Sequence, residues 1–243
     1  MKYYNLSASW DPKTTGLKNA GSQAETLRDG FSDKSNFDTY YQYFHGSGLE
    51  LGFERSKTLP PFPINLEYVK MEEKAILNDF LTFRPYLMSG KFLVSDKVVR
   101  ILSTFKLTEH RFYPVIIDYH GKMVTDYKLF YIPPLDFSFI DYSKSLFYTG
   151  SDLLKNKQLL QFENYDAYKN FTVKNLTETE IIVLKREFDK TLDYFGVRLT
   201  AKPFISEYLK ETFEIAGITG IDIKEAKHPE LVLEEDLLNK KES

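Results

Sequence analysis

The residues in this sequence with the clearest capacity for chemistry are two histidines that flank an aspartate. A group such as His110, Asp118 and His120 can bind a metal ion or transfer protons. Alternation along a strand puts Asp118 and His120 on one face, whereas His110 lies at the far end of the same apolar run. The spacing therefore favours ordinary surface residues.

Other segments resemble functional motifs but lack a required part. The His-Gly-Ser-Gly at 45–48 lacks the Gly-x-Ser-x-Gly arrangement of a nucleophile loop. The Ser-Gly-Lys at 89–91 lacks the upstream glycine and the following Ser or Thr of a phosphate loop. Asp136, Asp141 and Asp152 are scattered acids typical of turns. We predict no catalytic, cofactor-binding or metal-ligating residues.

One segment occurs twice in the chain. Residues 91–112 recur in altered form at 202–223 without a gap, and each copy predicts an apolar strand, a Ser-acid step, an amphipathic helix and a second short strand. The identical positions are Lys91/Lys202, Ser95/Ser206 and Thr108/Thr219. Since stable repeat arrays generally need at least three copies, two copies indicate a duplication.

A serine begins the predicted helix of each copy. Ser95 and Ser206 can accept hydrogen bonds from the first N–H groups of the helix, which is the N-cap role. Asp96 and Glu207 follow them and place negative charge at the positive end of the helix dipole. Gly217 stands where a left-handed C-terminal cap is expected. We interpret these serines as structural caps and not as nucleophiles.

The order of these segments resembles a family of bacterial immunity proteins, of the Myxococcus type, that protect cells from polymorphic toxins. The resemblance covers roughly residues 79–223, with weaker support at the N-terminus, and residues 10–70 match no family pattern. Besides the two units, the segments that carry it are Met1-Lys2-Tyr3-Tyr4, Asp79-Phe80-Leu81, Phe112-Tyr113-Pro114-Val115, Leu129-Phe130-Tyr131-Ile132, residues 139–145, Lys185-Arg186-Glu187-Phe188 and residues 217–221.

The resemblance implies a cytoplasmic protein that is not an enzyme and needs no cofactor. Its partner would be a cognate toxin domain, encoded by an adjacent gene, which it binds and neutralises in a stoichiometric complex. Two alternatives stay open on the residues alone. One is a hydrolase with a site between the two repeats, and the other is a non-catalytic structural scaffold.

Two regions are the sequence-based candidates for toxin contact. Loops vary without unfolding the scaffold, and exposed tyrosines supply a large contact area at small entropic cost. Tyr and Phe serve equally well in a core, so ordinary packing is the alternative. The candidates are Asp118, Tyr119, His120 and Asp126 at a predicted hairpin tip, and Tyr40, Tyr41, Tyr43 and Phe44 in an aromatic segment.

Composition limits the class of protein. The 243 residues can bury an ample core, and the lack of Cys excludes a disulfide framework and thiolate-bound zinc. A net charge of −3 argues against a general nucleic-acid binder. The N-terminus lacks an apolar signal region, and no stretch approaches the roughly 20 apolar residues of a membrane span. We therefore expect a cytoplasmic location and no membrane or nucleic-acid partner.

The elements predicted from the sequence give an α+β fold. We expect one domain, 1–243, with an N-terminal region 1–85, a core 86–223 and a charged tail 224–243 that can dock one helix. Strands are predicted at 2–9, 49–53, 65–71, 112–119 and 124–132, a helix at 72–83, a loop at 11–36 and a proline-rich linker at 57–63. Residues 152–161 fit a strand or a broken helix. Residues 177–188 are ambiguous between helix and strand, and the apolar run 181–184 favours a buried strand. Because strict strand-helix alternation is missing, we predict a single mixed, mostly antiparallel sheet that carries the two strand-helix units.

Overall fold

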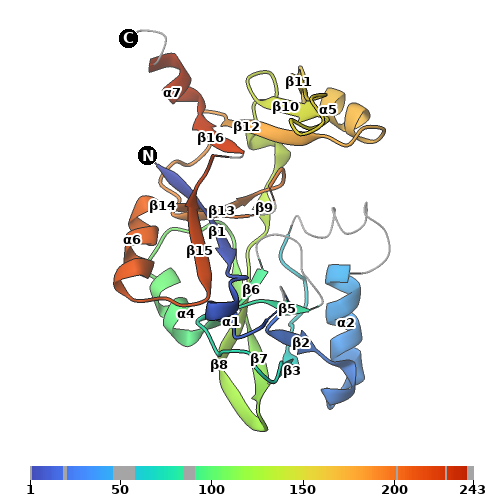
Figure 1. Cartoon of the computed structure of the whole chain (residues 1–243), viewed down its shortest axis with the longest axis vertical. Helices are drawn as coiled ribbons and strands as arrows, with labels where there is room; N and C mark the ends of the chain where they lie inside the picture. The colour runs from blue at the N-terminus through green and yellow to red at the C-terminus, as the bar shows by residue number, and fades with distance from the viewer. Residues whose placement is uncertain are drawn as a thin grey trace.

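Three β-sheets form the framework of the computed structural model, which describes residues 2–18, 21–45, 58–84, 91–200, 202–227 and 229–239 (Figure 1). The α+β class is confirmed. The prediction of a single sheet is wrong, because the strands of the described ranges fall into sheets of seven, five and four strands, each with parallel and antiparallel pairs.

The seven-stranded sheet has the order β4 (Phe80–Leu81), β6 (Lys91–Ser95), β8 (Lys122–Tyr131), β7 (Arg111–Tyr119), β3 (Leu66–Met71), β2 (Ala24–Thr26) and β5 (Phe83–Arg84). The five-stranded sheet has the order β15 (Ile221–Glu225), β1 (Tyr3–Ala8), β14 (Phe204–Ser206), β13 (Tyr194–Val197) and β9 (Pro134–Leu135). The four-stranded sheet has the order β11 (Gln158–Leu160), β10 (Leu146–Thr149), β12 (Glu178–Leu184) and β16 (Glu230–Leu233).

The α-helices of the described part are α1 (Pro12–Thr15), α2 (Lys34–His45), α4 (Asp96–Leu102), α5 (Tyr165–Thr172), α6 (Glu207–Ile215) and α7 (Glu234–Asn239). Two short 3₁₀ helices, η1 (Arg28–Gly30) and η2 (Phe137–Phe139), lie in the connections. Figure 1 shows α4 and α6 beside the region where the seven- and five-stranded sheets meet, whereas α5 lies with the four-stranded sheet at one end of the molecule.

A pair of prolines separates the sheets along the chain. Pro133 and Pro134 follow β8 after a single residue, Ile132, and proline has no N–H to continue a strand ladder. The chain therefore leaves the seven-stranded sheet after Tyr131. Pro134 and Leu135 then pair in parallel with β13 of the five-stranded sheet.

The duplication is present in the structure and extends beyond the segments matched in sequence. In the first unit, β8 lies between β6 and β7 and is antiparallel to both. In the second unit, β1 lies between β14 and β15 and is antiparallel to both. The N-terminal strand thus occupies in the second unit the place that β8 occupies in the first. The chain begins with the strand that completes its last repeat.

The two helices of the units pack together and run in opposite directions. Phe105, just after α4, contacts Tyr208 at the start of α6, with ring centroids 5.1 Å apart. Lys97, at the start of α4, donates to the carbonyl of Gly217 just after α6. One hydrophobic core contains residues of both helices and both preceding strands, namely Val94, Val98, Leu102, Ile205, Leu209 and Phe213, together with Leu6 of β1. The units are therefore related by an approximate twofold arrangement around a shared core.

Most local predictions in the strand-rich parts are confirmed. The strands expected at 2–9, 65–71, 112–119, 124–132 and 177–188 correspond to β1, β3, β7, β8 and β12. Gly217 has the left-handed backbone expected of a helix C-cap, with φ 61°. Residues 58–63 of the predicted linker form neither strand nor helix. The strand predicted at 49–53 and the motifs at 46–48 and 89–90 lie outside the described residues.

Other predictions are wrong, mostly where short elements pair with distant ones. The predicted loop 11–36 contains α1, β2, η1 and the start of α2. The predicted helix at 72–83 is instead a turn followed by β4 and the start of β5, because Phe80 and Leu81 pair with β6. The docked helix expected in the tail begins only at Glu234. Residues 230–233 before it form β16, which pairs in parallel with β12 and buries Leu233.

Candidate functional site

The two cap serines each bind an aspartate as well as the helix. Ser206 accepts a hydrogen bond from Leu209 N at 3.1 Å and donates to Asp193 Oδ1 at 2.7 Å. Ser95 accepts from Val98 N at 3.4 Å and donates to Asp79 Oδ1 at 2.6 Å. The N-cap prediction is confirmed for both serines.

The same aspartates join one unit to the other. Asp79 accepts from the backbone N and the hydroxyl of Thr219, at 3.0 and 3.1 Å, in the segment that follows α6. Asp193 accepts from Lys106 N at 3.0 Å, in the segment that follows α4. Each Ser-Asp pair therefore fixes a helix start and also holds the end of the opposite unit. The contacts of the two serines and of their aspartates in this chain are structural.

The structure separates the histidines of the predicted chemical group. His110 precedes β7 and packs edge-on against Phe112 and Phe130. His120 lies in the turn at the other end of β7, about 30 Å along an extended strand. In the described ranges, no set of three or more His, Asp or Glu side chains is placed to hold a metal ion.

Asp118 shapes the hairpin that ends in His120. Its carboxylate accepts from Tyr68 Oη at 2.8 Å and from Gly121 N at 2.7 Å. These two hydrogen bonds lower the pKa of Asp118. His120 has a positive φ of 55° and is exposed, and its ring lies 4.3 Å from that of the half-buried Tyr119. Asp126 is exposed farther along β8, so the tip remains a surface feature.

The aromatic segment forms α2, and only part of it reaches the surface. Tyr40 and Phe44 are one turn apart on the same helix face, and both are buried in the core beneath the seven-stranded sheet. They are therefore packing residues and not exposed contact residues. Tyr41 is exposed and stacks on Phe37, whereas the half-buried Tyr43 donates to Thr58 O at 3.2 Å.

An exposed apolar surface, which is not among the sequence-based candidates, lies at the end of the four-stranded sheet. Thr149 pairs with Gln158 and Tyr148 with Glu178, so the β10–β11 hairpin tip and the connection from α5 to β12 extend beyond the same end of the sheet. Large aliphatic side chains there are between 59% and 93% exposed. We call this set the apolar end: Leu153, Leu154, Leu159, Val173 and Leu176.

The signal for the apolar end was present in the sequence. Residues 152–160 read Asp-Leu-Leu-Lys-Asn-Lys-Gln-Leu-Leu, in which paired leucines alternate with polar groups. That pattern fits a strand or a broken helix, and leucine is normally assigned to a core. In the structure, residues 158–160 form β11, as the strand alternative predicts, whereas residues 150–157 form the tip between β10 and β11, where Leu153 and Leu154 are exposed.

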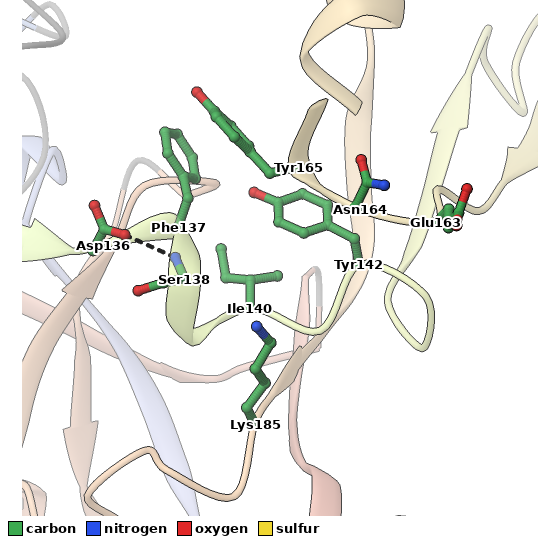
Figure 2. Close-up of a pocket in the computed structure, with 9 residues that line it drawn as sticks. All are labelled: Asp136, Phe137, Ser138, Ile140, Tyr142, Glu163, Asn164, Tyr165 and Lys185. Atoms are coloured by element: carbon green, nitrogen blue, oxygen red, sulfur yellow. Dashed lines mark hydrogen bonds between the residues drawn. The ribbon is translucent and has the colours of Figure 1, made fainter. Parts of the chain in front are cut away.

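A pocket of about 430 Å³ lies at the opposite end of the four-stranded sheet (Figure 2). Its walls come from the η2 segment, the start of α5 and the residue that follows β12. The residues that line it are Asp136, Phe137, Ser138, Ile140, Tyr142, Glu163, Asn164, Tyr165 and Lys185. Burial raises the pKa of Tyr142, so its phenol is neutral across the physiological range.

Comparison with known proteins adds no relative. No family model matches the sequence, and no curated protein is significantly similar to it. Among the described helices, none combines the length and the apolar character that crossing a bilayer requires.

Proposed function

We propose that this protein is an immunity protein that binds a cognate toxin domain and neutralises it in a stoichiometric complex. The observation that carries the proposal is the apolar end. Large exposed apolar side chains that gather at one end of a sheet are typical of sites of association. The family resemblance supplies the class of partner.

The energetics of the apolar end suit a binding surface. Burying a fully exposed leucine or valine contributes about 1.5 to 3 kcal/mol. The four most exposed side chains of the apolar end, all but Leu159, therefore supply roughly 6 to 12 kcal/mol before costs. A nanomolar complex needs a net of about −12 kcal/mol, and association itself costs about 4 kcal/mol or more. The apolar end can therefore anchor a complex, and further contacts over an interface of about 1,600 Å² would complete it.

The residues that hold the core together and the residues proposed to contact the toxin lie in different parts of the molecule, and this also supports the proposal. The residues of the two units pack inward and hold each other through Asp79, Asp193 and their serines. The leucines at 153 and 154 belong to a hairpin tip. Such a tip can change to match a different toxin without disturbing the shared core.

The test is growth rescue in a sensitive host that expresses the product of the adjacent gene. We expect the native protein to restore growth, and the double variant Leu153→Asp, Leu154→Asp to lose rescue while keeping its melting temperature. Ile215→Asp is the matched control, because Ile215 is 89% exposed on α6, outside the apolar end. It should rescue like the native protein. A toxic neighbour with neither rescue nor binding would refute the proposal for that pair.

The β7–β8 hairpin tip and α2 together form the alternative candidate surface for toxin binding. Tyr119→Ala, His120→Ala and Tyr41→Ala remove side chains at or near the surface. If these changes abolish rescue and the leucine variant does not, the toxin binds the β7–β8 hairpin and α2. The opposite result places it on the apolar end.

A further inference from the structure

The pocket of Figure 2 contains a buried hydroxyl that has no partner. Tyr142 is only 4% exposed, and its hydroxyl oxygen makes no hydrogen bond with the described residues. In Figure 2 this hydroxyl points into the space between Phe137, Tyr165 and Ile140. Leaving a buried hydroxyl unpaired is unfavourable, so a group that accepts its proton would be bound with a net gain.

The charges around the pocket indicate the sign of that group. Lys185 lines the same pocket, and in Figure 2 its ammonium points toward Ile140 from the side opposite Phe137 and Tyr165. No ion pair or hydrogen bond of this side chain is found within the described ranges. The guanidinium of Arg198 lies 5.2 Å from the ring of Phe137, beside the pocket. A cation would meet both positive charges, whereas an anion would be attracted by them.

Two of the acidic and amide groups of the lining already accept backbone hydrogen bonds, and a third points away from Tyr142 and Lys185. Asp136 Oδ1 accepts from Ser138 N at 2.9 Å, and Asn164 Oδ1 accepts from Ala167 N at 3.0 Å as the N-cap of α5. Glu163 is exposed, and its carboxylate points away from Tyr142 and Lys185 (Figure 2). Tyr142 therefore offers the pocket a phenol donor and Lys185 a cation, while the carboxylate of Asp136 stands at its edge.

The rest of the wall is apolar and aromatic. The rings of Phe137 and Tyr165 are stacked, with centroids 4.6 Å apart and planes 22° apart, and Ile140 lies below them. Such a wall accommodates a flat hydrocarbon body. The volume of about 430 Å³ is within the usual range for a small-molecule site.

We propose that this pocket binds a carboxylate attached to an apolar body, with Tyr142 donating a hydrogen bond to the carboxylate and Lys185 pairing with its charge. The carboxylate can belong to a free acid or to a side chain of a protein partner. The proposal does not depend on the immunity function.

The test is an NMR titration of the whole protein with millimolar 3-phenylpropanoate and with its neutral amide. We expect the acid to bind and the amide to bind at least about tenfold more weakly, because hydrogen bonds to charged groups are the stronger ones. Tyr142→Phe should weaken binding of the acid about tenfold, and Lys185→Gln should remove the preference for binding the acid over the amide.

Tyr194→Phe is the matched control. Tyr194 is also fully buried with an unpartnered hydroxyl, but it lies in the core shared by the two units and does not line the pocket of Figure 2. It should leave the affinity for the acid unchanged. Equal binding of acid and amide, or equal loss in Tyr142→Phe and Tyr194→Phe, would overturn the proposal.

A second titration distinguishes the two sources of the carboxylate. Its probe is an end-blocked peptide whose single carboxylate is a glutamate next to a phenylalanine. Binding of the free acid alone identifies a small-molecule site, and binding of the peptide identifies a side chain of a partner. If neither probe shifts the resonances of Tyr142 and its neighbours, the carboxylate assignment is wrong.

Discussion

The substitution Ser206→Ala removes the more buried of the two helix caps. Its hydroxyl satisfies Leu209 N and also donates to Asp193, and Ser206 is buried. Loss of an N-cap costs about 0.5 to 2 kcal/mol, and loss of a hydrogen bond to a charged group costs about 1.5 to 3 kcal/mol. Since the effects overlap, we expect the free energy of unfolding to fall by about 3 kcal/mol and the melting temperature by about 6 to 12 °C.

Urea denaturation of native and variant protein measures this difference. Ser143→Ala is the matched control, because Ser143 also donates to an aspartate, Asp141 Oδ1, at 2.7 Å, but at an exposed position. It should cost less than about 0.5 kcal/mol. A double-mutant cycle with Asp193→Ala should give a coupling energy of about 1 kcal/mol or more. A Ser206→Ala cost as small as that of Ser143→Ala would refute the view that this serine joins the two units.

Three further predictions test other parts of the fold. The hydrogen bond from Lys106, whose Nζ is 2.7 Å from the carboxylate, together with those from Thr191, lowers the pKa of Asp189 to about 2. The stabilisation from this group is therefore present above about pH 4 and is lost as the pH falls toward 2; NMR titration should show the pKa of Asp189 rising in Lys106→Gln, and an unchanged value would contradict this assignment. Gly220→Ala should destabilise far more than Gly217→Ala in urea titrations. A Cβ at Gly220 would lie 2.1 Å from Phe80 O, whereas one at Gly217 meets no atom within 4 Å, and equal costs would contradict the packing at Gly220. Leu6→Ala should cost about 2 to 5 kcal/mol if β1 completes the second unit, and a cost below 1 kcal/mol would show that it does not.

Local chemistry made much of the fold predictable. Ser95 and Ser206 were identified as caps because the apolar strand, the serine and the acid stand in the order that begins a helix. The β7–β8 hairpin followed from two apolar runs separated by a short turn. Helix α2 could also be predicted, since Phe37, Tyr40, Tyr41 and Phe44 follow helical spacing. The Gly- and Ser-rich residues before it favour a loop instead.

Pairing between distant strands could not be predicted in the same way. The sequence of β1 does not say that it joins β14 and β15, some 200 residues later, and β4 is only two residues long. The partners of the cap serines were equally hidden, because Asp79 and Asp193 meet them only after the strands have paired. For the candidate surfaces, the burial of each side chain in the folded structure separates packing residues from exposed ones. Tyr40 and Phe44 face inward, while the leucines at 153 and 154 face solvent.

The most direct test of the proposed function is calorimetric titration of the purified protein with the catalytically inactivated product of the adjacent gene. The account predicts a one-to-one complex of about nanomolar affinity or tighter, weakened at least about a hundredfold by Leu153→Asp, Leu154→Asp and unchanged by Ile215→Asp. No heat of binding with a neighbour of proven toxicity would contradict the account, and an undiminished affinity of the leucine variant would contradict the role of the apolar end.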